Sequence, residues 1–326
     1  MFKKIFSLAL CCSLALCGLA GCSSASAEKD NDKKHIVCTV FPEYDWVKEI
    51  LGEHTENFDI TYLLANGADM HSYQPTMDDM VKISSCDLFI YVGGESDKWA
   101  DDAISEAKNK DMKTVNLLDS LGDSLKEEEI KEGMQSCEDE EHDHEEEAEY
   151  DEHVWLSFGN AEKLCAVITD GICSVDPDNA DDYRSNLDSY TDKLETLDNE
   201  YSDVLSSVKE KTLVFGDRFP FRYLVDDYGL DYYAAFSGCS AETEASFETI
   251  TFLADKVNEL NTDTVFTIEG SDASIAEAVI SGTKDKNQKI VTLNSIQSVT
   301  SEQIKDGTTY ISIMKSNLDT LKEALN

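Results

Sequence analysis

The sequence lacks the short motifs that mark the common catalytic and nucleotide-binding sites. Its 326 residues contain no P-loop, no Gly-x-Ser-x-Gly, no Gly-x-Gly-x-x-Gly, no His-Glu-x-x-His and no Cys-x-x-Cys. Such motifs position the nucleophile, base, phosphate or metal of the enzymes that use them. Their absence removes the usual grounds for proposing a nucleotide-dependent or hydrolytic enzyme.

Basic residues are also scarce. The 27 Lys and Arg stand against 67 Asp and Glu, which gives a net charge of −40. Nucleic acid and anionic lipid headgroups both require a basic face, so we expect neither to bind, whereas cations should be attracted. Only four prolines are present, which excludes proline-rich architectures, and 41% apolar residues suffice for folded cores. The length suggests two domains.

Long apolar runs are absent except at the N-terminus. Two lysines precede an apolar stretch from Ile5 to Leu19, which is short for a bilayer span and typical of a secretory signal. It ends in Leu-Ala-Gly-Cys22 and a Ser/Ala tether, which resembles a bacterial lipobox. We predict a signal peptide over 1–21, then lipidated Cys22 and a tether over 22–34, which anchor the chain to the extracytoplasmic face of the cell membrane. An ordinary signal peptide with an incidental cysteine is the alternative.

The cysteines show no disulfide-scaffold pattern. Three of the ten leave with the signal peptide and Cys22 is lipidated. Some of the remainder could pair in an exported chain, but the sequence does not fix the connectivity. Cys38 and Cys165 fit best as buried small apolar residues. The six remaining cysteines are Cys38, Cys86, Cys137, Cys165, Cys173 and Cys239.

Apolar runs alternate with helical patterns along both halves of the mature chain. This alternation predicts βαβ units, and therefore an α/β fold of two lobes, each a parallel sheet flanked by helices. The predicted strands lie at 35–41, 58–64, 87–93, 114–118, 212–216, 231–236, 264–268 and 289–293. The predicted helices include 78–84, 97–110, 247–260, 275–281 and 310–325.

A long helical pattern separates the two halves. From Asn179 to about Glu210, apolar residues recur four and three positions apart, as in the a/d stripe of a heptad repeat. A helix of about 30 residues would be about 45 Å long. It either joins the two lobes as a rigid rod or pairs with a second chain as a coiled coil. The predicted domains are an N-terminal lobe over 35–177, a linking helix over 178–210 and a C-terminal lobe over 211–326.

An acidic segment interrupts the first lobe. Eleven of the fifteen residues from Glu138 to Glu152 are acidic, and His142 and His144 lie among them. Such a run cannot bury enough apolar surface to fold alone. We predict a solvated loop over 136–152, which could also gather cations near a binding site.

Two histidines stand where ligands are often bound. His71 lies in Gly-Ala-Asp-Met-His-Ser-Tyr-Gln-Pro-Thr, residues 67–76, just beyond the second predicted strand, and open α/β sheets bind ligands beyond strand ends. His153 ends the acidic segment and precedes Val-Trp-Leu. A loop histidine is often only solvated, but imidazole is also the commonest metal ligand.

These two segments resemble the metal-specific solute-binding lipoproteins of ABC importers, the zinc and manganese cluster. Residues 67–76 are similar to the family's G-A-[DE]-x-H-x-[FY]-x-P-[ST] loop, and residues 151–156 to its D-x-H-x-W-L segment. The resemblance continues through 176–180 and ends at 310–318, so it covers essentially the whole mature chain. It implies a monomer of two lobes joined by one rigid helix, with metal in the interlobe cleft and delivery to a permease and its ATPase.

The resemblance also implies the metal ligands. His71 and His153 match the family's first two ligands directly. The third, usually His or Glu, falls within 214–223, where no His is present and one inserted residue is needed. Asp217 is the nearest donor there, unless Arg218 pairs with it.

The fourth ligand is open on this resemblance. Asn294 occupies the family position as a neutral oxygen donor, and Glu269 could replace it. Two imidazoles with one or two oxygens suit Zn²⁺, and imidazole with several oxygens also suits Mn²⁺. Binding should weaken as acid protonates the histidines.

The sequence therefore predicts a lipid-anchored binding protein, not an enzyme, that captures Zn²⁺, or alternatively Mn²⁺, for an ABC importer. Two other interpretations stay open. One is a secreted metallohydrolase with Glu269 or Asp217 as base at an open zinc site. The other is a lipid-anchored adhesin in which the metal only stabilises the fold.

Overall fold

A computed structural model of the chain describes residues 33–135, 149–240 and 243–326. Lys34–Asn326 form one compact unit. The predicted signal peptide, Cys22, Cys137, His142 and His144 lie outside the described residues. The domain boundaries therefore stay a prediction.

None of the described helices combines the length and apolar character needed to cross a lipid bilayer.

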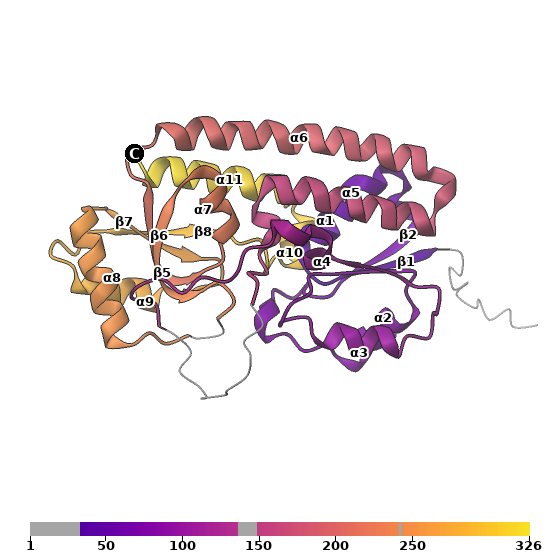
Figure 1. The fold of residues 1–326 in the computed structure, drawn as a ribbon, viewed down its shortest axis with the longest axis horizontal. Helices are drawn as coiled ribbons and strands as arrows, with labels where there is room; N and C mark the ends of the chain where they lie inside the picture. Colours follow the sequence, from indigo (N-terminus) through magenta and orange to yellow (C-terminus); the bar gives the residue numbers. More distant parts are fainter. Residues whose placement is uncertain (1–32, 136–148, 241–242) are drawn as a thin grey trace, which may run out of the picture. The chain divides into compact units, whose positions relative to one another are not determined.

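Two four-stranded parallel sheets carry the fold, and both have the same strand order (Figure 1). The first runs β2-β1-β3-β4 and the second β6-β5-β7-β8, so the second half repeats the topology of the first. Every residue of β3 and β7 is buried, as expected where helices cover both faces of a parallel sheet. The fold class predicted from alternation is confirmed. The strands are β1 (Lys34–Cys38), β2 (Phe58–Tyr62), β3 (Leu88–Tyr91), β4 (Lys113–Asn116), β5 (Thr212–Phe219), β6 (Asp231–Ser237), β7 (Thr264–Ile268) and β8 (Lys289–Leu293).

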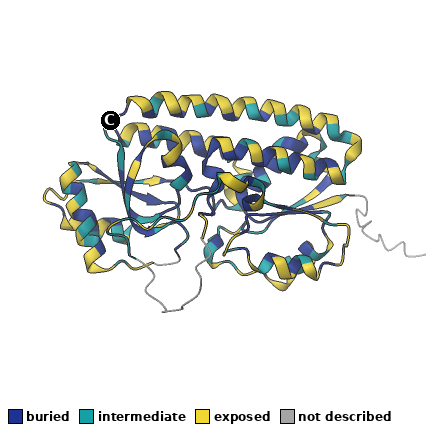
Figure 2. Cartoon of the chain, viewed as in Figure 1, coloured by how far each residue is buried: buried dark blue, intermediate teal, exposed yellow. Residues whose placement is uncertain are grey.

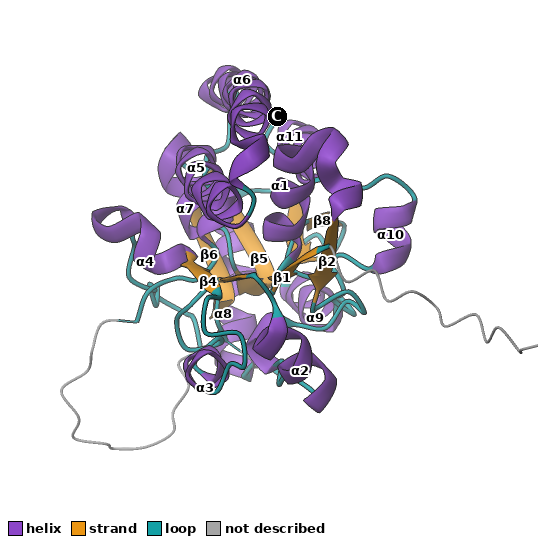
Figure 3. Ribbon diagram, turned by 90° about the vertical axis from the view of Figure 1, so that its right-hand side faces the viewer, coloured by secondary structure: helices purple, strands orange, loops and turns teal. Residues whose placement is uncertain are grey.

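Helices form a layer on each side of the strands (Figure 3). Helices α1, α5, α6 and α11 lie on one side, and α2, α3, α8 and α9 on the other. The helices are α1 (Phe41–Leu51), α2 (Met77–Ser85), α3 (Trp99–Ser105), α4 (Leu117–Leu121), α5 (Phe158–Val175), α6 (Ala180–Ser207), α7 (Arg222–Tyr228), α8 (Phe247–Leu260), α9 (Ser274–Gly282), α10 (Ser301–Lys305) and α11 (Tyr310–Ala324).

The long helix α6 links the two halves within one chain. It has 28 residues, about 42 Å at 1.5 Å per residue, and runs past both sheets (Figure 1). Its apolar stripe is buried against α1, α5 and α11, which leaves no seam for a second chain, so the coiled-coil alternative is wrong. The buried members of the stripe are Tyr183, Tyr190, Leu194, Leu197, Tyr201 and Leu205.

The apolar cores explain where the two halves are fixed and where they are separate. One large core beneath α1, α5, α6 and α11 continues across both sheets, and it includes Trp155, Phe158, Phe215 and Tyr310. On the opposite side each sheet has its own small core. Figure 2 shows the buried strands between the helix layers. The two halves therefore share one core beneath α6. On the side of α2, α3, α8 and α9 their cores are separate, so loops from both halves can meet there and form a site.

Some elements were not predicted. The 18-residue helix α5 and the short α4, α7 and α10 went unrecognised, and α3 ends at Ser105 rather than at Lys110. The five described cysteines are all free, and Cys38 and Cys165 are buried in the large core as predicted.

Two buried acids in the first half make stability depend on pH. Glu43 accepts hydrogen bonds from the backbone N–H groups of Thr39 at 2.7 Å and Val40 at 3.3 Å. Burial and the nearby Asp97 raise the pKa of Glu43 to about 8. Burial likewise raises the pKa of Asp97 to about 7. Both carboxyl groups hold protons in the folded chain at pH values where the unfolded chain releases them.

The free energy of unfolding should therefore fall as pH rises from the ordinary carboxyl range to about 8. We expect the metal-free chain to melt about 5 °C higher at pH 5 than at pH 8. Glu43→Gln keeps an acceptor for Thr39 and should shrink that difference, whereas the exposed Glu53→Gln should not. Thermal melts at both pH values test this, and an unchanged difference in Glu43→Gln would contradict it.

Candidate metal centre

His71 is held in a short turn beyond β2. Asp69 begins the 3₁₀ helix η2 (Met70–Ser72), and its Oδ1 accepts the backbone N–H of His71 at 2.9 Å. The His71 side chain is only 3% exposed. Its Nδ1 lies 2.9 Å from Ser96 Oγ and 3.4 Å from Glu152 Oε2. These contacts fix the ring so that Nε2 faces away from them.

His153 is fully buried and is held in the same manner. Asp151 Oδ1 accepts the backbone N–H of His153 at 2.9 Å and lies 3.1 Å from its Nδ1. The ring of Trp155 packs edge-on against the imidazole, with centroids 5.4 Å apart. Trp155 Nε1 in turn donates to the carbonyl oxygen of Ser295 at 2.7 Å, which anchors this segment to the second half.

The two imidazoles meet through their remaining nitrogens. His71 Nε2 and His153 Nε2 lie 3.2 Å apart. In each ring the other nitrogen faces a carboxylate, the arrangement that orients metal-binding histidines and fixes which nitrogen carries the proton. The sequence prediction that these two histidines lie together agrees with this geometry.

Cys239 completes a group that the sequence did not suggest. Three possible ligand atoms, one each from His71, His153 and Cys239, lie within 4.8 Å of one another. Among the described residues, this is the group of His, Cys, Asp or Glu side chains that could hold a metal ion. Cys239 comes from the second half, just beyond β6, and its N–H donates to Glu128 Oε1 at 2.8 Å. The candidate site therefore draws on both halves.

The residue before Cys239 explains how the thiol reaches this position. A Cβ on Gly238 would lie 2.8 Å from the carbonyl oxygen of Phe219, so a side chain there would push the loop away. Glycine lets the two segments approach. The available signal in the sequence was Gly-Cys directly after a buried strand, since ligands gather at the carboxyl ends of parallel strands.

Burial and nearby carboxylates set the charges of the group. Burial lowers the pKa of His71. Burial acts in the same direction on His153, but Asp151 outweighs it and the pKa of His153 is raised. Burial raises the pKa of the Cys239 thiol well above its ordinary value. A metal must displace the protons held by His153 and by the Cys239 thiol, so capture should release protons and weaken in acid.

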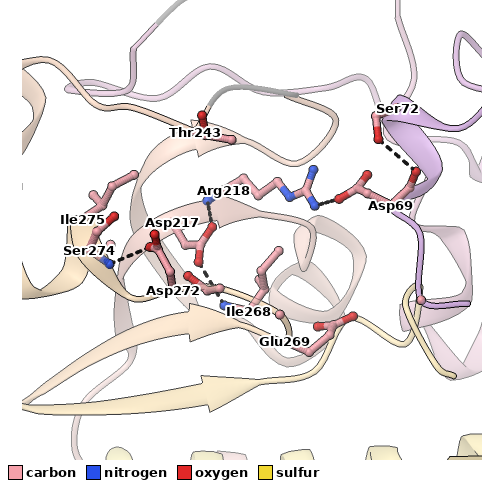
Figure 4. A pocket seen from close by; sticks show the side chains of 14 residues that line it. Asp69, Ser72, Asp217, Arg218, Thr243, Ile268, Glu269, Asp272, Ser274 and Ile275 are labelled. Atoms are coloured by element: carbon pink, nitrogen blue, oxygen red, sulfur yellow. Dashed lines mark hydrogen bonds and ion pairs between the residues drawn. The ribbon is translucent and has the colours of Figure 1, made fainter. Parts of the chain in front are cut away.

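Asp217, the predicted third ligand, lies elsewhere. Its Oδ1 accepts the N–H of Arg218 at 2.9 Å and its Oδ2 that of Ile268 at 3.3 Å. It lines a cavity of about 560 Å³ together with Glu269 and Asp69 (Figure 4). The guanidinium of Arg218 forms an ion pair with Asp69 and not with Asp217, the partner considered from the sequence.

The two candidates for a fourth ligand also have partners of their own. Glu269 is partly buried and accepts hydrogen bonds from Ser295, at 2.7 Å from its N–H and 2.6 Å from its hydroxyl. The carboxamide oxygen of Asn294 accepts the N–H of Ile296 at 2.7 Å. Neither is grouped with His71, His153 and Cys239 among the described residues.

The end of the acidic segment differs from the solvated loop predicted for it. Asp151 and Glu152 are each only 2% exposed, since they support the two histidines. A cavity of about 260 Å³ lies against His71 and Cys239. It is lined by Glu95, Glu128, Glu149 and Glu152. Four carboxylates around one small cavity create a negative potential that favours cations.

A two-lobed α/β fold with candidate metal ligands gathered from both halves fits the architecture of a solute-binding protein. The family model described as zinc-uptake complex component A, periplasmic, ZnuA, matches residues 36–324. The chain belongs to this family. Family membership agrees with a binding protein and not with the metallohydrolase interpretation.

Individual relatives agree with this assignment. The chain is 31% identical over 337 residues to the high-affinity zinc uptake system protein ZnuA of Bacillus subtilis, covering 100% of this chain and 99% of that protein. It is 31% identical over 314 residues to the zinc-binding lipoprotein AdcA of Streptococcus pneumoniae, covering 95% of this chain. It spans only 59% of that longer protein. The crystal structure of the Zn(II)-bound ZnuA-like domain of AdcA matches with a TM-score of 0.69 and 29% identity, covering 90% of this chain and 99% of that domain.

Proposed function

We propose that the chain captures Zn²⁺ between its two lobes and delivers it to the permease of an ABC importer. The observation that carries this proposal is the convergence of His71 Nε2, His153 Nε2 and Cys239 Sγ from both halves of the chain. The relatives named as zinc-binding and zinc-uptake proteins support the same cargo.

The ligand chemistry favours Zn²⁺ over Mn²⁺. Zinc accepts thiolate and imidazole ligands together in tetrahedral sites, whereas manganese prefers carboxylate, carbonyl and water oxygens. A site that includes Cys239 therefore suits zinc better than the all-oxygen third and fourth positions expected from the sequence. Mn²⁺ binding in preference to Zn²⁺ would show that Cys239 is not a ligand.

We propose an oxygen donor for the fourth position. Asp217 and Glu269 line the cavity of about 560 Å³ that also contains Asp69 and Ser72, which flank His71 closely in sequence. Asn294 is the weakest of the three candidates, because its donor is a neutral amide oxygen and it is not among the residues that line this cavity.

The metal content of the chain from residue 28 onward, which retains every described residue, tests capture directly. We expect one equivalent of Zn²⁺ by elemental analysis after purification, bound tightly in competition with a chelator. The absence of stoichiometric metal would contradict the proposal.

Delivery and anchoring are tested in cells. We propose that lipidated Cys22 holds the chain at the extracytoplasmic face of the membrane, where it supplies the permease and its ATPase as a monomer. Deletion of the gene should abolish zinc uptake at limiting zinc, and the intact chain should restore it, but His153→Ala should not. Unchanged uptake with lost surface adhesion would favour the adhesin interpretation instead.

A further inference from the structure

Arg218 makes contacts to both halves of the chain. It lies near the end of β5, and its guanidinium Nη2 forms an ion pair with the carboxylate of Asp69 in the first half. Its Nη1 donates to the carbonyl oxygen of Ser240 in the second half at 3.1 Å. Figure 4 shows the side chain of Arg218 extending toward Asp69 across the cavity. The side chain is only 14% exposed, so solvent screens the ion pair weakly.

Both partners of Arg218 lie next to a proposed metal ligand. Asp69 uses its other oxygen to cap the turn that carries His71, through the N–H of His71 at 2.9 Å. Ser240 directly follows Cys239. A single guanidinium therefore links the loop that positions His71 to the loop that positions Cys239.

The local backbone directs Arg218 to this place. The pairing of β5 with β6 shifts register between Phe215 and Arg218, a bulge of the kind that re-aims a side chain. The Asp217 carboxylate holds the strand there by accepting the N–H groups of Arg218 and Ile268. Arginine suits the position because its rigid planar fork donates from two separate nitrogens, Nη2 to Asp69 and Nη1 to Ser240, whereas lysine donates from a single nitrogen atom.

We propose that Arg218 is a positioning residue that clasps the His71 loop to the Cys239 loop and thereby slows the release of bound metal. The clasp consists of Asp69, Arg218 and Ser240, and the inference rests on the proposed metal site. With the clasp in place, the loops that carry His71 and Cys239 stay linked, so the two ligands do not move away from the ion independently of each other. Without it, the loops separate independently.

Loss of the clasp should change the release rate more than the capture rate. Breaking one partner of a largely buried, hydrogen-bonded charge pair acts mainly on dissociation, so we expect release about 10- to 100-fold faster. Arg218→Gln and Asp69→Asn should both show this. Asp69→Asn is the sharper variant, because an asparagine oxygen can still cap His71 while the charge is lost.

Stopped-flow release of Zn²⁺ into excess chelator measures the effect. Arg218→Gln, Asp69→Asn and the double variant are compared with wild type and with Arg184→Gln, an exposed arginine of α6 that pairs only loosely with Asp181. We expect the double variant to release metal no faster than the faster single variant, because the two side chains act through one contact. Zinc release from Arg218→Gln and Asp69→Asn at the rate of Arg184→Gln would overturn the clasp. So would a double variant whose release is faster by the product of the two single effects. Arg218→Lys should release metal nearly as fast as Arg218→Gln. If Arg218→Lys releases metal at the wild-type rate, the two-nitrogen fork of the guanidinium is not required.

Co²⁺ spectra separate failure of the clasp from failure of the site. Wild-type chain should show a thiolate-to-cobalt charge-transfer band that disappears in Cys239→Ser. If that band is present and the release rates of the clasp variants are unchanged, the clasp alone is wrong. If wild-type chain lacks the band, the proposed site is wrong and the clasp falls with it.

Discussion

His71→Ala is expected to lower the affinity for Zn²⁺ by at least ~10³-fold, since loss of an outer-shell partner alone typically costs 10- to 100-fold. The variant removes one of the three proposed ligands, and His153 is the one other described histidine in the group. The turn around residues 67–72 and the Asp69 cap remain, so the fold should be retained. Competition titration against chelators of graded affinity measures the change.

Two companion variants make this test specific. His54→Ala removes a histidine that contacts Asp182 at the start of α6, away from the candidate site, and should leave zinc affinity unchanged. Asp151→Asn keeps an oxygen near His153 Nδ1 but removes its charge, and should cost about 10- to 100-fold. Equal affinities for wild type and His71→Ala would refute the site.

Cys239→Ser is expected to reduce zinc affinity by about 10²-fold or more and to narrow the preference for zinc over manganese. The change replaces a soft thiolate with a weakly acidic hydroxyl of nearly the same shape, so the loop should keep its geometry. Cys239→Asp should move selectivity further toward Mn²⁺, because a carboxylate is the harder donor. Titrations with both metals give the ratio directly.

The cysteine control comes from the same chain. Cys173→Ser alters a buried cysteine at the end of α5, whose thiol contacts the carbonyl oxygen of Ala180 and no residue of the candidate site. It should leave both metal affinities unchanged. If Cys239→Ser also leaves them unchanged, a carboxylate such as Asp217 or Glu269 must take the third position, as the sequence alone suggested.

The strands could be predicted from the sequence because most of them contain a run of apolar residues, as β3 and β7 do. In the second half, β7 and β8 occupy 264–268 and 289–293 as predicted, and α8 occupies 247–260. Helix α5 was missed because Gly, Thr and Cys interrupt its apolar pattern, although its buried face is regular in the structure. Its burial depends on packing against α6 and β4, which no local window contains.

Only the part of the site that lies in distinctive sequence motifs could be predicted from the sequence. His71 and His153 each sit in a distinctive segment, but the third position depends on contacts between distant parts of the chain. Beside the bulge in β5, the Asp217 carboxylate is already used as a hydrogen-bond acceptor by the N–H of Ile268. The close approach of Gly238 to Phe219 places Cys239 near the two histidines. Both features arise from pairing between β5 and β6. Proximity in the sequence therefore favoured Asp217, whereas the fold favours Cys239.

Zinc K-edge X-ray absorption on the zinc-loaded chain identifies the atoms that bind the metal. We expect one sulfur scatterer at about 2.3 Å and two imidazole nitrogens at about 2.0 Å, with any remaining ligand an oxygen. The sulfur should vanish in Cys239→Ser and persist in Cys173→Ser. A first shell of nitrogen and oxygen alone in the wild-type chain would contradict the assignment of Cys239, and a shell without imidazole would contradict the site as a whole.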